Sequence, residues 1–199
     1  MNKFAQFFKT MFKKKPEVKV SEKTIIRQQV RRRKYQIDPE KSKDESQKTF
    51  HKIEQMLDFQ QAKSVLVYWS MTDELPTHDF ILKWSATKTI LLPVIKNDKM
   101  YIMPFSSKEK LVVGEFGIWE PDSQTEYINS IDIAIIPGVA FDRDKNRMGR
   151  GKGYYDMYLE NKHIKKWGVG FDFQYYDKIP YESYDIKMDK IFTASFTIE

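Results

Sequence analysis

Short apolar runs that alternate with helix-like segments constrain the fold of this chain more than any other feature. Such runs lie at 64–69, 89–94, 131–136 and 167–171, and each has the length of a single strand. Strands of this kind are usually buried on both faces, as in a parallel sheet covered by helices. We therefore predict an α/β fold in a single domain: a mostly parallel sheet with helices on both faces, which is a three-layer α/β/α sandwich.

The chain divides into two parts of unequal size. Residues 1–20 form a basic segment, interrupted by Pro16, which is either disordered or helical. Residues 21–199 form the α/β domain, and Ser21 is a suitable N-cap for its first helix. The domain's helices are predicted at 21–35, 45–59, 78–85 and 154–160, and its strands at 64–69, 89–94, 100–105, 131–136, 167–171 and 190–196.

Composition excludes several classes of protein. A hydrophobic content of 41% suits a packed soluble globule, and the absence of cysteine excludes disulfides and thiolate metal sites. No apolar run approaches the roughly 20 residues of a membrane span, so we expect no membrane association. The first residues lack the apolar core and cleavage site of a signal peptide, so the expected location is cytoplasmic.

The chain is basic, with a net charge of +6, and much of that charge lies in two clusters at 9–19 and 27–34. We interpret them as a solvated face, although they would also attract polyanionic small molecules. No RNA- or DNA-binding motif is present, so no nucleic-acid partner is expected. The sequence does not specify an oligomeric state.

A glycine-rich segment at 147–156, which follows the run at 131–136, carries the clearest functional signal. It reads Arg147-Met148-Gly149-Arg150-Gly151-Lys152-Gly153-Tyr154-Tyr155-Asp156. Glycine backbone can approach an anion closely and point N–H groups at it, while the cationic side chains between the glycines add charge. The N-terminus of the helix expected at 154–160 would add a positive dipole end.

Two further observations favour a phosphate site over a solvated loop. Asp156 is a carboxylate that would hold a Mg²⁺ ion bridging phosphates. The segment also follows a strand that ends in Pro137-Gly138, and ligands of open α/β sheets bind beyond the carboxyl ends of strands. No Ser or Thr follows Lys152, so the segment is not a Walker A loop.

Together with Ile136-Pro137-Gly138-Val139-Ala140-Phe141-Asp142, this segment resembles the signature of the 5-formyltetrahydrofolate cyclo-ligase family. Other segments resemble the family's patterns in the same order along the chain. They are Lys23-Thr24-Ile25-Ile26-Arg27, 68–77, 114–121, 170–174, Ile179-Pro180 and Tyr184-Asp185.

The resemblance implies a reaction and its cofactors. ATP phosphorylates the formyl oxygen of 5-formyltetrahydrofolate, N10 attacks the formyl carbon, and phosphate leaves. The products would be 5,10-methenyltetrahydrofolate, ADP and phosphate. The implied cofactors are ATP and Mg²⁺, and the implied partners are these small-molecule substrates, which are themselves polyanions.

The resemblance also implies roles for individual residues. Lys152, Arg150 and Arg147 would be catalytic, through contacts with the transferred phosphoryl group. The nucleotide site would comprise Lys23, Arg27, Arg147, Gly149, Arg150, Gly151, Lys152, Gly153, Tyr154 and Tyr155. The folate site would comprise Arg27, Trp69, Glu74, Arg150, Gly151, Lys152, Gly153 and Tyr154. Asp156 and Asp185 would hold the metal, with Asp189 as an alternative to Asp185.

Structural alternatives stand beside several of these roles. Arg147 would otherwise brace the loop, and Trp69 would otherwise be a core residue at a strand end. Lys23 and Arg27 share one helix face by their spacing of four, which also describes a solvated basic face. The roles of Glu120 and Gln174, which lie in matching segments, are left open.

The chain departs from the family pattern at Lys145, where a glycine is common. A turn that needs a positive φ there would cost a lysine about 1 kcal/mol, so the loop is expected to differ in shape. Met148 replaces a leucine of similar volume. Two rival functions remain: a non-catalytic RNA- or protein-binding module on the same fold, and a sugar-phosphate isomerase or transferase on a similar scaffold.

Overall fold

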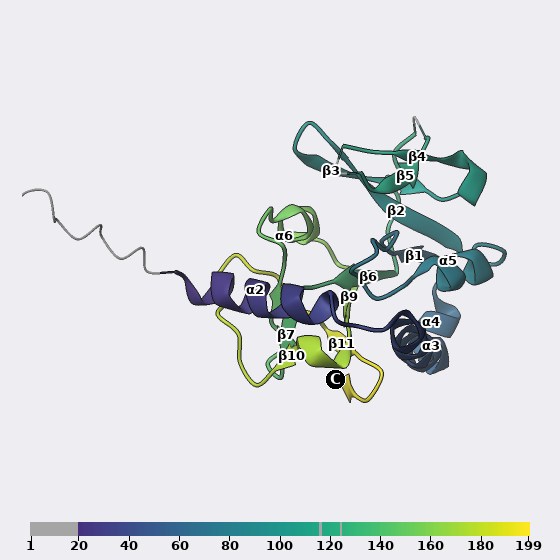
Figure 1. Cartoon of the computed structure of the whole chain (residues 1–199). Coiled ribbons are helices and arrows are strands. Elements are labelled where there is room, and N and C mark those ends of the chain that lie inside the picture. Colours follow the sequence, from purple (N-terminus) through teal and green to yellow (C-terminus); the bar gives the residue numbers. More distant parts are fainter. Residues whose placement is uncertain (1–19, 116, 124) are drawn as a thin grey trace, which may run out of the picture.

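A seven-stranded sheet forms the centre of the computed structural model, which describes residues 20–115, 117–123 and 125–199 (Figure 1). The strand order is β12-β11-β9-β6-β1-β2-β3. The strands span β1 (Ser64–Leu66), β2 (Thr89–Lys96), β3 (Lys99–Pro104), β6 (Ile133–Pro137), β9 (Lys165–Val169), β11 (Lys190–Phe192) and β12 (Thr197–Ile198). From β11 to β2 all neighbours are parallel, and only the pairs at the two edges are antiparallel. The prediction of a mostly parallel sheet is therefore confirmed.

Helices cover both faces of this sheet, as predicted. One face packs against α3 (Pro39–Gln55), α4 (Leu57–Gln61) and α5 (His78–Trp84), and the other against α6 (Tyr154–Leu159). Neighbouring residues of one strand serve the two layers: Val65 is buried among the side chains of α3 to α5, and Leu66 is buried beside Leu159. This alternation is why the central strands are apolar throughout.

A small second sheet supports the glycine-rich segment. It has the order β10-β7-β8 and is built from β7 (Ala140–Asp142), β8 (Arg147–Met148) and β10 (Tyr175–Tyr176). Helix α2 (Glu22–Lys34) packs on it through Ile26 and Val30, which contact the same cluster as Met148. As predicted, α2 begins after Ser21, whose Oγ accepts a hydrogen bond from Thr24 N at 3.3 Å.

A hairpin of β4 (Leu111–Val113) and β5 (Trp119–Pro121), preceded by the 3₁₀ turn η1 (Lys108–Lys110), lies beside β2 (Figure 1). The buried carboxylate of Glu120 fastens it there by accepting a hydrogen bond from Ile95 N at 3.1 Å. Gly114 is needed at this point, because a Cβ in its place would overlap the Glu120 carboxylate. Glu120, whose role the sequence left open, thus has a structural contact. A second 3₁₀ turn, η2 (Asp172–Gln174), precedes β10.

Several predicted boundaries were wrong. The helix expected at 45–59 begins earlier, after Asp38, and breaks at Met56, where the backbone is extended, to give α3 and α4. The strand expected at 64–69 ends at Leu66. The strand expected at 190–196 ends at Phe192, and the residues after it form the turn that leads to β12. The missed start had a recognisable signal, since Asp38 is an N-cap and Pro39 occupies the first turn.

No helix in the described part of the chain is long and apolar enough to cross a membrane. The predicted basic segment 1–20 lies outside the described residues, apart from Val20.

Lys145 adopts the conformation that favours glycine, with φ at +64°, so the loop keeps its positive-φ turn rather than changing shape. We expect Lys145→Gly to raise the free energy of unfolding by about 0.5–1 kcal/mol, because glycine removes the steric cost. Urea unfolding would measure this change. Lys178→Gly, at an exposed position without positive φ, is the control and should not stabilise; equal effects of the two substitutions would contradict the explanation.

Candidate functional site

The sequence-predicted site residues come together around one cavity of about 900 Å³. It lies beyond the carboxyl ends of β1 and β6, where Trp69 and Gly138 are part of its wall. The predicted residues that line it are Lys23, Arg27, Trp69, Glu74, Arg147, Gly149, Arg150, Gly151, Lys152, Gly153, Tyr154, Tyr155, Asp156 and Asp185. Asp189, the alternative metal ligand, does not line it.

The three glycines of the segment are required for different reasons. Gly151 and Gly153 have φ values of +105° and +71°, which side chains rarely adopt. Gly149 makes room instead, because a Cβ there would lie 3.1 Å from an Arg147 guanidinium nitrogen. Gly153 is also the N-cap of α6, although this helix has only 6 residues, so its dipole is small.

Arg147 is a buried partner of Asp156 and not an exposed cation. Its Nη2 donates to both carboxylate oxygens of Asp156, at 2.9 and 3.0 Å, and its Nη1 donates to Pro137 O at 3.2 Å. The side chain is 4% exposed, and its Nε is buried without a partner among the described residues. These contacts favour the bracing role, and a direct phosphate contact stays a prediction.

The two residues predicted to hold a metal lie in segments that contact each other. Asp156 Oδ1 accepts a hydrogen bond at 3.2 Å from the backbone N of Ile186, the residue after Asp185. Asp185 Oδ2 pairs with Lys23 Nζ at 2.9 Å. No group of three or more potential metal-ligating side chains occurs in the described ranges, but Mg²⁺ needs only one or two carboxylates when phosphates complete its shell.

One face of α2 contacts the glycine-rich segment, as the spacing of four predicted. Arg27 Nε donates to Gly149 O at 3.1 Å, and Lys23 on the next turn reaches Asp185. Lys152, in contrast, is exposed, and no carboxylate in the described part of the chain lies within ion-pair distance of it. Lys152 is therefore the cation of this segment that a phosphate would meet without displacing a carboxylate.

The opposite wall carries Glu74 and Trp69. Glu74 Oε2 accepts a hydrogen bond from Met71 N at 3.1 Å, and its Oε1 accepts one from Arg150 Nη2, also at 3.1 Å. Trp69 is 7% exposed and stacks on His78 with 4.2 Å between ring centroids. Both interpretations of Trp69 therefore apply, because it is a core residue whose edge forms part of the cavity wall.

Sequence reasoning missed Asp73 and the hairpin residues Ile118 and Trp119, which line the cavity or contact its lining. Asp73 accepts two hydrogen bonds from Arg150, at 2.7 and 3.0 Å. The sequence did offer a signal for Asp73, because it is a second acidic residue next to Glu74 in the loop after a predicted strand. Trp119 is 49% exposed and belongs to β5, a strand too short to be recognised from its pattern.

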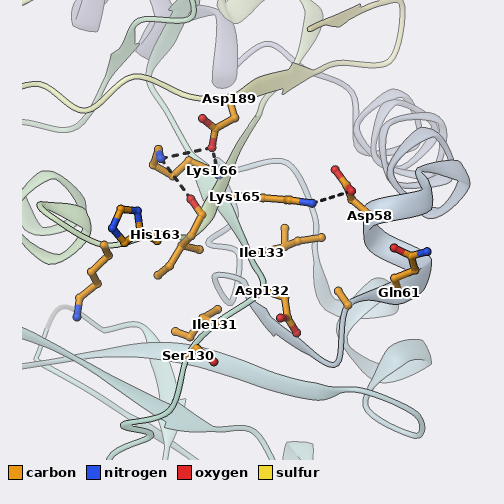
Figure 2. Close-up of a pocket in the computed structure, with 13 residues that line it drawn as sticks. Asp58, Gln61, Ser130, Ile131, Asp132, Ile133, His163, Lys165, Lys166 and Asp189 are labelled. Atoms are coloured by element: carbon orange, nitrogen blue, oxygen red, sulfur yellow. Dashed lines mark hydrogen bonds and ion pairs between the residues drawn. The ribbon is translucent and has the colours of Figure 1, made fainter.

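A second cavity, of about 620 Å³, lies at the amino ends of the parallel strands (Figure 2). Its charges are balanced: Asp189 accepts from Lys166 N at 2.6 Å, and Asp58 pairs with Lys165 at 2.7 Å. Ligands of such sheets bind at the opposite edge, so the cavity beside the glycine-rich segment is the candidate site.

Comparison with known proteins agrees with this geometry. A family model described as the 5-formyltetrahydrofolate cyclo-ligase family matches residues 19–194. The chain belongs to this family. The cyclo-ligase of Escherichia coli K12 is 30% identical over 176 residues, which cover 83% of this chain and 97% of that protein. The cyclo-ligase of Haemophilus influenzae is 31% identical over 143 residues, covering 67% and 76% of the two chains.

A solved structure of a family relative shares the fold. The 5,10-methenyltetrahydrofolate synthetase of Aquifex aeolicus superposes with a TM-score of 0.81 at 28% identity, covering 89% of this chain and 92% of that one. The match of the cyclo-ligase family to residues 19–194 includes every segment around the cavity, from α2 to Asp185.

Proposed function

We propose that the α/β domain, residues 21–199, catalyses the ATP-dependent cyclisation of 5-formyltetrahydrofolate to 5,10-methenyltetrahydrofolate, with release of ADP and phosphate. The observation that carries this proposal is a single cavity in which the glycine-rich segment with Lys152 faces the loop with Glu74. A phosphate-binding surface and a carboxylate suited to a pterin edge therefore share one site.

The chemistry requires both substrates at once. The formyl oxygen attacks the γ-phosphorus of ATP, and the bond from that phosphorus to ADP breaks. N10 then forms a bond to the formyl carbon and loses its proton, and phosphate leaves with the former formyl oxygen. An amide-like oxygen is a poor leaving group and phosphate is a good one, so the protein chiefly positions the substrates and neutralises charge.

On the nucleotide side, Lys152 and the backbone N–H groups around Gly151 would contact the phosphates. Arg27 supports that backbone through its bond to Gly149 O. Tyr154 and Tyr155, which also line the cavity, offer flat surfaces for a ring.

On the folate side, Glu74 would accept N–H donors from the pterin edge, because a carboxylate oxygen has lone pairs left after one hydrogen bond. Trp69 would form the apolar wall beside the ring. This arrangement would place the formyl group between Glu74 and Lys152, which line the same cavity.

Asp156 and Asp185 fit a Mg²⁺ site, since both line the cavity and the backbone N of the residue after Asp185 donates to Asp156. Bound Mg²⁺ would neutralise charge on the transferring phosphoryl group. Arg147 holds Asp156 through two hydrogen bonds, and Lys23 pairs with Asp185.

The test is an absorbance assay of purified protein with 5-formyltetrahydrofolate and MgATP, following the near-ultraviolet band of the methenyl product. The band should grow only when protein, ATP and Mg²⁺ are all present. A folded protein that forms no product would refute the proposal and favour a non-catalytic binding module.

Asp185→Asn should raise the Mg²⁺ concentration for half-maximal turnover by at least about tenfold, because it removes a carboxylate charge from the site. Calorimetric titration with ATP at several Mg²⁺ concentrations should show the same shift without turnover. Asp189→Asn is the matched control, since Asp189 lies at the second cavity. A shift with Asp189→Asn, and none with Asp185→Asn, would reverse the assignment.

A further inference from the structure

Arg150, which lines the cavity, is held by two consecutive carboxylates from the loop after β1. Its Nη2 donates to Asp73 Oδ1 at 2.7 Å, to Asp73 Oδ2 at 3.0 Å and to Glu74 Oε1 at 3.1 Å. A guanidinium Nη carries two hydrogens, so three acceptor oxygens share them. In the described part of the chain, Nε and Nη1 make no hydrogen bond, so their three hydrogens remain available to a ligand.

The backbone does little to fix this guanidinium. Arg150 lies between Gly149 and Gly151, and its side chain is 49% exposed. The guanidinium lies at the end of a long, half-exposed side chain, so its position depends on what it contacts. Those contacts come from the loop after β1, 76 and 77 residues away in the sequence.

Asp73 is itself anchored from a third element. Lys34, at the end of α2, is 8% exposed and places its Nζ 3.6 Å from Asp73 Oδ2. Burial works against the ionised form of Asp73, but the charges of Lys34 and Arg150 outweigh it and hold the pKa of Asp73 below its ordinary value. Asp73 therefore stays charged between two cations from different parts of the fold.

We propose that Asp73 is a positioning residue that keeps Arg150 in place for catalysis once folate has bound. The inference rests on the proposed function, in which the pterin takes up Glu74. A pterin that donates to Glu74 shares that carboxylate with Arg150 and weakens their contact, so Asp73 becomes the main anchor of Arg150. Held by Asp73, Arg150 presents its three available N–H groups to the oxygens that gain charge during phosphoryl transfer.

The proposal predicts a split between turnover and binding. Asp73→Ala should lower kcat by about 10- to 100-fold, because a misplaced catalytic group costs on this order. The Kd of a non-hydrolysable ATP analogue, measured by calorimetry, should change by less than about threefold, since losing an anion does not weaken anion binding. Asp73→Glu, which restores a carboxylate, should recover part of the lost kcat.

Two matched variants separate positioning from stability. Asp58→Asn removes a carboxylate from an ion pair that is also 2.7 Å long and similarly exposed, but lies at the second cavity (Figure 2), and should leave kcat unchanged. Asp73→Ala leaves the buried Lys34 without its carboxylate partner, which should lower stability. Lys34→Met is therefore combined with Asp73→Ala in a double variant. The double variant should regain stability and keep the low kcat.

The outcomes distinguish the two proposals. If the unsubstituted protein shows no turnover, the proposed function fails and the role of Asp73 falls with it. If turnover is normal and Asp73→Ala keeps kcat within about threefold, only the positioning role is wrong. Recovery of kcat by Lys34→Met in the Asp73→Ala background would also refute it, since the defect would then be one of stability.

Discussion

Lys152→Ala is expected to reduce turnover of 5-formyltetrahydrofolate by about 100- to 1,000-fold, the loss typical of removing one preorganised group that stabilises developing charge. Lys152 is exposed at the cavity and has no carboxylate within ion-pair distance in the described ranges, so its charge is free to meet a phosphate. The methenyl absorbance assay measures the change directly.

The folded state should not suffer from this substitution. Lys152 is exposed and makes no ion pair among the described residues, so the urea unfolding curve should change little. Lys43→Ala, which removes an equally exposed lysine from α3, is the control and should retain full turnover. Retention of more than about a tenth of the activity in Lys152→Ala would contradict the assigned role.

Phe141→Ala should lower the free energy of unfolding by about 3–5 kcal/mol, the usual cost of emptying a buried aromatic site. Phe141 is fully buried in β7, and its ring packs against the backbone at Gly138, Gly168 and Gly170. A Cβ at Gly168 would lie 2.6 Å from this ring, so the ring fits only because residue 168 is a glycine.

Urea unfolding followed by circular dichroism would measure this loss. Phe141→Leu keeps most of the volume and should cost less than about 2 kcal/mol. If both substitutions cost the same, contacts specific to the aromatic ring, and not the cavity, would account for the effect.

The candidate site was predictable at the level of residue types and poorly predictable at the level of contacts. The glycines, the cations and Asp156 of the segment 147–156 could be recognised from the sequence, because they lie close together in the chain. The pairing of Arg147 with Asp156 and of Lys23 with Asp185 was not predictable, because each depends on how separate elements pack. Arg147, expected to contact phosphate, is paired with Asp156 in the structure, and its phosphate contact stays a prediction.

The limits of the fold prediction have a similar origin. Long apolar strands and the capped helix α2 were recognised, since burial on both faces and an N-cap leave local patterns. The sheets β10-β7-β8 and β4-β5 were missed, because strands of two or three residues carry no periodic pattern. Lys145 shows a different limit: its turn kept a positive φ despite the lysine, because the surrounding loop and sheet determine the backbone there.

By itself, the sequence determined the parallel α/β architecture, the family and the segments that build the site, because these follow from hydrophobic periodicity and from residues close together in the chain. Only the tertiary structure decided which charges are paired. It joined Arg150 to Asp73 and Asp73 to the buried Lys34, and it left Lys152 exposed. Interactions across such separations depend on the packing of α2, the loop after β1 and the glycine-rich segment, which no local pattern encodes.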